Sequence, residues 1–421
     1  MVCLLLASCA QRPLPVETYA QVRERVDRER YFNISAATRD LAENVGQLRR
    51  LRVKRSIYSS YLQPEAFLKQ LRNHTPSPSV EQERIIRARR TAFGLPQPLE
   101  KSEQDRRGPL PDSLLGFYDQ DGERIYVRTK FKLLRPDFDE MDLTVVHETA
   151  HALQHQHFGN DLFRTRPTDE SLALRALIEG DATATTVAYA GWKLAAPTRE
   201  AIEHTRGLAL IPISETPDRD PDLPSREDTF VYLDGLRFAA ELYRVGGFAL
   251  LDKTMRSPPI STEQVLHPQK YLSGERPIEV PAPEAPTGYV RIESGTMGEL
   301  GIGIVLSQCA KEDETGATDW GGDVFLLAES DRHDLILEWN TVWDSDDAAL
   351  RFEKAIRHAA SCWTSKAGAS LSISPEFTIA RDHNRVAVVR GMHDEEGQIQ
   401  AQRLLKMPTM PNRRAASGQS R

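Results

Sequence analysis

Two histidines and a glutamate form the most informative short pattern in the chain, H-E-x-x-H over residues 147–151. On an α-helix, positions i and i+4 project from one face, so the imidazoles of His147 and His151 can bind one metal ion. Glu148 stands between them and can take the proton from a water molecule that the metal activates. Apolar residues flank the pattern, and no Gly or Pro interrupts residues 138–158, which predicts a buried helix. The pattern therefore predicts a zinc site with Glu148 as its general base.

Zinc needs a third protein ligand and an open fourth position, and two residues compete for the third place. His157 lies where a metzincin has its third histidine. A metzincin, however, needs Gly at the position of Gln154, because glycine lets the chain turn back toward the metal. Glu179 lies on the next predicted helix, which is the gluzincin arrangement. Asp181 could orient one of the metal ligands without binding the metal itself. We favour Glu179 as the third ligand, with His157 as the alternative.

Residue patterns also predict the elements that position these side chains. A β-strand at residues 53–62 ends before Pro64, where proline at a first turn starts a helix. Residues 116–128 are typical of a β-hairpin with an Asp-Gly turn. Residues 258–272 are expected to form an irregular loop. Further helices are expected at residues 80–93, 137–158, 172–189 and 229–243.

The composition changes after a proline-rich stretch at residues 278–286, which we interpret as a domain boundary. An α+β module is expected over residues 285–405, with Trp339 and Trp343 packed against its sheet. Residues 408–421 are basic and are expected to be a disordered tail. In the module we expect strands at residues 323–328, 335–342 and 385–390, and a helix at residues 346–362.

A chain of 421 residues suggests two domains. We expect residues 10–52 to form a tether and N-terminal helices, and residues 53–277 to form the metal-binding domain. The formal net charge is −7, and no concentrated basic surface is evident, so the sequence predicts no nucleic-acid partner. Arginine runs such as residues 49–55 are expected to lie on solvated helix faces.

The first nine residues have the order of a bacterial lipoprotein signal, with a short apolar stretch, small residues and then a cysteine. Residues 6–9 match the lipobox pattern, in which the cysteine that follows the cleaved bond becomes lipidated. We therefore expect residues 1–9 to be a signal ending at Cys9, which would anchor the protein in the bacterial cell envelope. Cys309 and Cys362 could form a disulfide in such a compartment or remain free thiols.

Beyond the zinc pattern, several segments resemble a prokaryotic family of gluzincin-like metallopeptidases, over roughly residues 45–395. The resemblance implies a thermolysin-like metal core, in which the two ligand helices pack beneath a small sheet. Members of the family more often have Leu or Phe in place of Thr149, a difference that leaves the ligands unchanged. The segments are residues 116–119, 146–158, 178–182, 259–271 and 320–323.

In gluzincins a His or Tyr downstream of the ligands commonly donates a hydrogen bond to the oxyanion that forms during hydrolysis. We expect His267 to have this role, with Tyr271 and Tyr232 as alternatives. The predicted strand that contains Tyr126 could hold an extended peptide by pairing along its edge.

These observations predict an α+β protein with a helical gluzincin metal core, a small sheet and a C-terminal α+β module. The expected function is that of an envelope-anchored zinc metallopeptidase with one Zn²⁺ per chain, acting on a peptide or protein substrate. One alternative is a non-catalytic zinc-stabilised scaffold that works through its C-terminal module. Another is a zinc hydrolase of a non-peptide amide or ester.

Overall fold

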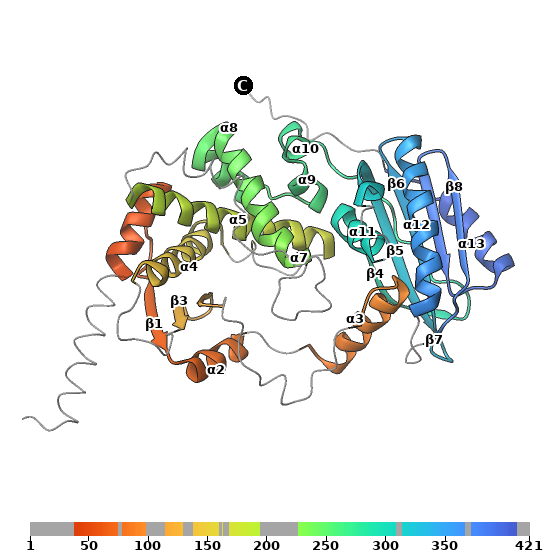
Figure 1. Cartoon of the computed structure of the whole chain (residues 1–421), viewed down its shortest axis with the longest axis horizontal. Helices are drawn as coiled ribbons and strands as arrows, with labels where there is room; N and C mark the ends of the chain where they lie inside the picture. The colour runs from red at the N-terminus through yellow and green to blue at the C-terminus, as the bar shows by residue number, and fades with distance from the viewer. Residues whose placement is uncertain are drawn as a thin grey trace, which may run out of the picture.

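The structure is a computed structural model with two β-sheets and many helices, an α+β architecture. Figure 1 shows the helices α4, α5 and α8 on one side of the molecule and the larger sheet on the other. No helix among the described residues is long and apolar enough to cross a membrane. The described residues are 38–74, 78–97, 114–128, 138–159, 162, 168–193, 226–308, 314–366 and 372–410.

The smaller sheet has the strand order β1-β3-β2. β2 (Gly116–Asp119) and β3 (Arg124–Arg128) form the predicted antiparallel hairpin, and β1 (Tyr58–Leu62) pairs with β3 in parallel. Ile125 and Val127 are two residues apart on β3, so their side chains point to the same face of the sheet. Both are fully buried against α4. α2 (Pro64–His74) follows β1 and begins at the predicted proline.

Two long helices pack against each other, and the first of them lies on this sheet. α4 (Phe138–Phe158) and α5 (Thr168–Lys193) correspond to the helices predicted at residues 137–158 and 172–189. α4 packs against α5 and against β2 and β3. α5 is rich in Ala, and its small side chains let the neighbouring helices lie close to it.

A third helical stretch packs against α5. It consists of α7 (Arg226–Thr229), a π-helical segment η4 (Phe230–Asp234) and α8 (Gly235–Arg256). We predicted that this helix would end near residue 243, closed by the two glycines at residues 246 and 247. Gly247 (φ 63°, ψ −164°) does interrupt the helix there, and a further helical segment continues beyond this kink to Arg256.

The prediction of an irregular loop at residues 258–272 was wrong, because two short helices form there. α9 (Thr262–Leu266) begins after Ser261, whose hydroxyl accepts a hydrogen bond from the Gln264 backbone N–H. α10 (Pro268–Ser273) has proline in its first turn and ends at Gly274, which adopts φ 75°. These caps stabilise helices that residue composition alone does not indicate.

The larger sheet has the order β4-β5-β6-β9-β8, with β7 pairing beside one end of β6. Helices cover both faces of this sheet. α3 (Val80–Ala92), α11 and α12 lie on one face, and α13 lies on the other face. The three strands and the helix predicted in this module are confirmed, whereas β8 and α13 were not predicted. The elements are β4 (Tyr289–Gly295), α11 (Gly298–Ser307), η5 (Glu314–Ala317), β5 (Trp320–Ser330), β6 (Asp334–Trp343), α12 (Asp346–Lys366), β7 (Ser372–Ile373), β8 (Phe377–Asp382), β9 (Arg385–Arg390) and α13 (Asp394–Leu405).

Trp339 and Trp343 are fully buried in the core of this sheet, as predicted. The carboxylate of Asp323 accepts hydrogen bonds from the indole N–H groups of Trp320 and Trp339, and from the backbone N–H groups of residues 297 and 298. Asp323 therefore joins β5 to the first turn of α11 and leaves the backbone donors there satisfied.

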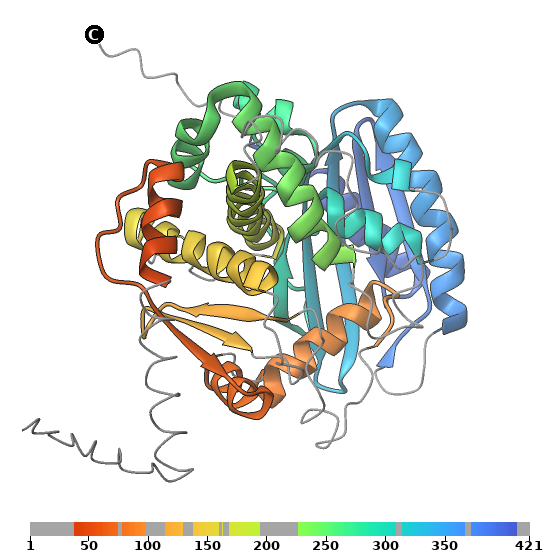
Figure 2. The ribbon, with the colours of Figure 1, turned by 60° about the vertical axis from the view of Figure 1, so that its left-hand side comes forward.

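One helix from the first half of the chain belongs to this same core. α3 (Val80–Ala92) lies against the larger sheet, as the rotated view shows in orange (Figure 2). The ring of Phe93 meets the rings of Phe325 and Trp339 edge to face, at centroid distances of 5.4 and 5.1 Å. Arg390 donates hydrogen bonds to the carbonyls of residues 91 and 92 at the end of α3.

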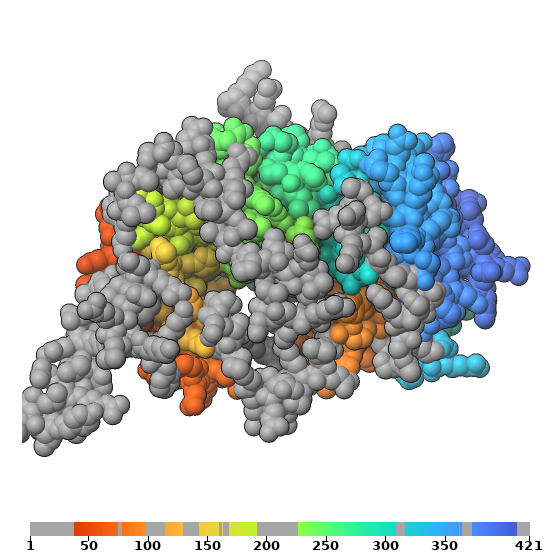
Figure 3. Space-filling view, viewed as in Figure 1, coloured from red at the N-terminus to blue at the C-terminus, as the bar shows by residue number. Residues whose placement is uncertain are grey.

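In the space-filling view, the C-terminal module forms the blue end of the molecule (Figure 3).

Candidate metal centre

α4 and α5 bring three metal-ligating side chains together. His147 and His151 lie one turn apart on α4, and Glu179 faces them from α5. The distance from Glu179 Oε2 is 3.1 Å to His147 Nε2 and 3.4 Å to His151 Nε2, and the two Nε2 atoms are 3.2 Å apart. A tetrahedral zinc site with ligand bonds of about 2.0–2.1 Å has ligand atoms about 3.3 Å apart. The three atoms therefore have the spacing that one zinc ion requires.

The cluster is open on one side. The side chains of His147, His151 and Glu179 are 22%, 12% and 21% exposed, so solvent reaches them. A catalytic zinc site needs such an opening, because its fourth position takes water or substrate. The donor set of two imidazoles and one carboxylate is also one that zinc accepts.

Of the two candidate third ligands, the structure places Glu179 beside the histidines and not His157. The ring of His157 makes a hydrogen bond from Nε2 to the carbonyl of Arg52, at 2.8 Å. α4 continues straight through Gln154 to Phe158, so the chain does not turn back toward the metal. Glu179, and not His157, is thus the third group of the cluster.

The carboxylate of Glu179 attracts positive charge on the histidines beside it. Burial alone would lower the pKa of His151, but the carboxylate of Glu179 outweighs this and raises it to about 9. Burial would likewise raise the pKa of Glu179, but the two histidines hold it well below its usual value. Without a metal, the carboxylate of Glu179 is thus ionised and pairs with a proton on His151, and a metal ion that binds here would take the place of that proton.

Glu148 lies beside this cluster and is 7% exposed. Burial raises its pKa, and the positive histidines offset this only in part. Its carboxylate accepts a hydrogen bond from the backbone N–H of Tyr118 in β2. A carboxylate with a raised pKa, held in a fixed position, is suited to receive and return a proton.

The prediction that the strand of Tyr126 pairs with a substrate along its edge was wrong. Tyr126 lies in β3, which has β1 on one side and β2 on the other. Within the described residues, β2 is an edge strand, and it lies beside α4. The hydroxyl of Tyr118 and Nδ1 of His155 are 3.0 Å apart, which ties β2 to α4. Among the strands that the structure describes, the edge strand next to Glu148 is therefore β2.

The three candidates for oxyanion stabilisation have different surroundings. Nε2 of His267 lies 2.9 Å from Oε1 of Glu299 in α11, and the structure does not bring His267 into the metal cluster. The hydroxyl of Tyr271 donates to a backbone carbonyl at residue 257. Tyr232 lies on the π-helical turn η4, where the negative charge of Glu179 raises its pKa. Tyr232, which is 37% exposed, is the candidate within electrostatic reach of the site.

Asp181 is fully buried and touches no ligand directly, because Gln154 lies between it and His151. Asp181 also forms an ion pair with Arg49, a side chain that is 1% exposed. The prediction that Arg49 lies on a solvated helix face was therefore wrong. Gln154 comes three residues after His151 on one helix, and this spacing could have predicted from the sequence that the two side chains meet. No such spacing in the sequence indicates Arg49.

The predicted lipidation and disulfide residues cannot be compared with the structure. Cys9 and Cys309 lie outside the described residues, as does the side chain of Cys362.

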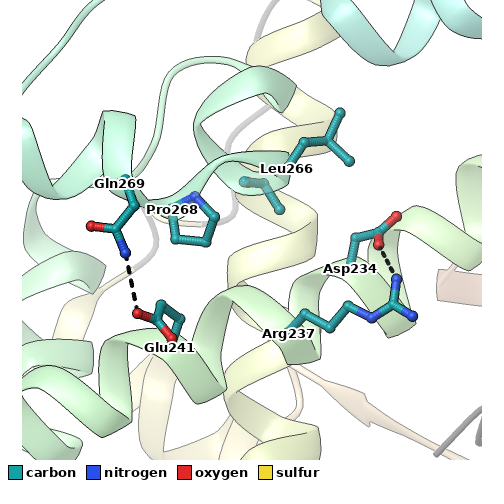
Figure 4. Close-up of a pocket in the computed structure, with 7 residues that line it drawn as sticks. Asp234, Arg237, Glu241, Leu266, Pro268 and Gln269 are labelled. Carbon is teal, nitrogen blue, oxygen red and sulfur yellow. Dashed lines mark hydrogen bonds and ion pairs between the residues drawn. The ribbon is translucent and has the colours of Figure 1, made fainter. Parts of the chain in front are cut away.

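A separate pocket of about 380 Å³ lies between α8, α9 and α10 (Figure 4). None of the metal-binding residues lines it. Its polar side chains bond to close neighbours, Arg237 to Asp234 and Gln269 to Glu241. It is distinct from the candidate metal centre in its lining residues.

Comparison with known proteins identifies one region of similarity. Residues 287–401 match a family model described as a domain of unknown function (DUF8575). This match covers most of the C-terminal module and none of the metal-binding residues. No curated protein and no solved structure gives a significant match to the chain.

Proposed function

We propose that this protein is a zinc-dependent metallopeptidase of the gluzincin type, with one Zn²⁺ held by His147, His151 and Glu179. The observation that supports this most strongly is the triangle of ligand atoms, 3.1 to 3.4 Å apart, with Glu148 next to it. The packing of α4 on the small sheet and of α5 on α4 supports a thermolysin-like core.

In this proposal zinc, when bound, acts as a Lewis acid that polarises the scissile carbonyl and makes water more acidic. Glu148 takes one proton from the attacking water, as a new C–O bond forms at the carbonyl carbon. The same carboxylate then gives the proton to the amide nitrogen as the C–N bond breaks. The products are a free carboxyl group and a free amine, so the proton and the electrons balance.

The surrounding residues position the substrate. The outer edge of β2 lies next to Glu148, and an extended peptide could add to it as a further strand. We assign to Tyr232, whose pKa the charge of Glu179 raises, the donation of a hydroxyl hydrogen to the carbonyl oxygen as negative charge develops there. These two roles replace those we first expected for the strand of Tyr126 and for His267.

The proposal is tested by metal content and turnover together. Elemental mass spectrometry of the purified protein should find about one zinc per chain. Glu179→Ala should lose it and His157→Ala should keep it, since only Glu179 lies in the cluster. Absence of zinc from the wild-type protein would contradict the proposal.

Glu148→Gln separates an enzyme from a zinc-stabilised scaffold. The variant should keep its zinc but lose activity on a peptide library by about 10²- to 10⁴-fold, since it lacks the general base. If the wild type binds zinc and cleaves no peptide, amide and ester substrates of other classes should be tried next. A wild type that binds zinc and turns over none of them would favour the scaffold.

We further propose that Cys9 anchors the protein in the bacterial envelope. Cells fed a labelled fatty acid should incorporate the label into the wild-type protein and not into Cys9→Ser. Equal labelling of both proteins, or of neither, would contradict the anchor.

A further inference from the structure

We propose that Gln154 is a positioning residue that presents Nε2 of His151 to the metal, and that Arg49 sets its orientation through Asp181. This inference rests on the proposed zinc site and concerns three side chains behind one of its ligands, those of Arg49, Asp181 and Gln154. It follows from which groups can donate and which can accept hydrogen bonds.

The sequence of hydrogen bonds begins at Arg49, whose guanidinium can only donate. Nη1 of Arg49 donates to Oδ2 of Asp181 at 2.8 Å, and both side chains are 0% exposed. Nη2 reaches Asp252 in α8 at 2.9 Å, and the guanidinium lies over the ring of Phe248. Arg49 is therefore fixed, and it faces Asp181 as a carboxylate, which can only accept.

The next group is the amide of Gln154, which is also fully buried. Nε2 of Gln154 donates to Oδ2 of Asp181 at 2.8 Å and to the backbone carbonyl of Ile178 at 3.0 Å. Both partners are acceptors, so both amide hydrogens are used. Rotating the amide by 180° would place its oxygen against two other acceptors, so this rotation is excluded.

The oxygen of Gln154 must consequently face His151, where Oε1 lies 2.9 Å from Nδ1. An amide oxygen only accepts, so Nδ1 must have the hydrogen. In the neutral imidazole Nε2 then has the lone pair, and Nε2 is the atom that lies beside Glu179 and His147. The buried ion pair thus selects the tautomer of His151 that can bind a metal.

Gln154 also stabilises the third ligand. Its bond to the carbonyl of Ile178 holds the backbone immediately before Glu179. The amide of Gln154 therefore connects His151 on α4 with the segment of α5 that positions Glu179. Methionine at this position would fill similar volume but would make none of these bonds.

Gln156 provides a matched control on the same helix. It is 7% exposed, and its side-chain bonds within the described residues go to the backbone of residues 54 and 55. Gln156→Met thus removes a comparable set of bonds between α4 and another segment, but none that leads to a metal ligand.

The test compares zinc-loaded wild type, Gln154→Met and Gln156→Met as full-length proteins. Competition with a chelator measures zinc affinity, and NMR of ¹⁵N-histidine-labelled protein identifies which nitrogen of His151 has a protected hydrogen. Gln154→Met should weaken zinc binding by about 10- to 100-fold and remove the protected Nδ1 hydrogen. Gln156→Met should change neither.

Three results would overturn the inference. The first is zinc affinity in Gln154→Met equal to that of the wild type. The second is an equal loss of affinity in both variants, which indicates a general structural effect. The third is a wild-type spectrum in which Nδ1 of His151 lacks a protected hydrogen, and this measurement needs no variant to fold. Failure of the proposed peptidase would appear differently, as wild-type protein that binds zinc and cleaves nothing.

Discussion

At the residue scale, the partners of a side chain decide its role more than its chemical type does. His157, His267 and Tyr271 can all bind metal or donate a proton in principle. In the structure each of them makes a hydrogen bond elsewhere, to Arg52, Glu299 and Ser257 respectively. The side chains that meet at the candidate metal centre are His147 and His151 from α4 and Glu179 from α5.

Tyr232→Phe tests the oxyanion assignment. Loss of the hydroxyl should lower kcat by about 10²- to 10³-fold, with zinc content unchanged, because it removes one donor to the developing charge. Steady-state kinetics on the best peptide substrate would measure this. His267→Asn should leave kcat within about twofold of the wild type. A large loss of kcat in His267→Asn, with none in Tyr232→Phe, would instead assign the oxyanion role to His267.

His267 should instead contribute to stability in a pH-dependent way. Its hydrogen bond to Glu299 raises its pKa above 6.5, and Glu263 adds to this while Lys270 opposes it. A histidine whose pKa is higher in the folded state stabilises the fold below pH 6.5, and this contribution is lost as the pH rises through the folded-state pKa.

The wild type should therefore exceed His267→Asn in thermal stability more at pH 6 than at pH 9. The difference should be below about 1 kcal/mol, because the imidazole is 40% exposed and solvent screens the pair. Melting curves of both proteins at the two pH values provide the measurement. A difference that does not change with pH would show that the ion pair contributes nothing.

At the element scale, the metal centre depends on how closely α5 packs against α8. A Cβ added at Gly180 would lie 2.1 Å from the carbonyl oxygen of Gly235, and one added at Gly235 would lie 2.3 Å from that of Ala176. Both contacts are with backbone, which cannot rotate away. Glycine is therefore required at this crossing, one residue after Glu179.

Gly235→Ala should destabilise the protein by about 1–3 kcal/mol, because the two helices must move apart. It should also weaken zinc binding, since α5 holds Glu179. Thermal unfolding and chelator competition would measure both effects.

Gly303→Ala in α11 is the matched control, because the nearest atom to its added Cβ is the Cβ of Ala317 at 3.9 Å. That variant should be neutral or more stable by up to about 1 kcal/mol, as expected from helix propensity. Equal effects of the two substitutions would argue against close packing at the α5–α8 crossing.

At the scale of the whole molecule, α3 connects the first half of the chain with the C-terminal sheet. Two salt bridges lie along this contact, from Arg84 to Glu329 and from Arg89 to Glu293. Phe93 closes the core at the end of the helix. The C-terminal module thus contains a helix from outside the residues that match the domain family.

Phe93→Ala should destabilise the larger sheet by about 3–5 kcal/mol, because it leaves a cavity in the core. Hydrogen exchange should accelerate in β5 and β6. Phe67 in α2 is equally buried but packs on Phe117 of the smaller sheet, so Phe67→Ala should leave exchange in β5 and β6 unchanged. Slow exchange in β5 and β6 of the Phe93 variant would show that α3 is dispensable there.

The sequence by itself determined the features that depend on neighbours within a few residues. The helical spacing of His147 and His151, the hairpin at residues 116–128 and the strands of the C-terminal module follow from local periodicity and turn chemistry. Glu179 could be proposed from its position on the next helix.

Only the tertiary structure decided which distant groups meet. It placed β3 between two other strands, Arg49 beside Asp181, and Tyr232 where the charge of Glu179 acts on it. Contacts of this kind join residues far apart in the chain, and they form only when the helices pack. A pattern of residue types contains the period of a helix but not the angle at which it crosses its neighbour.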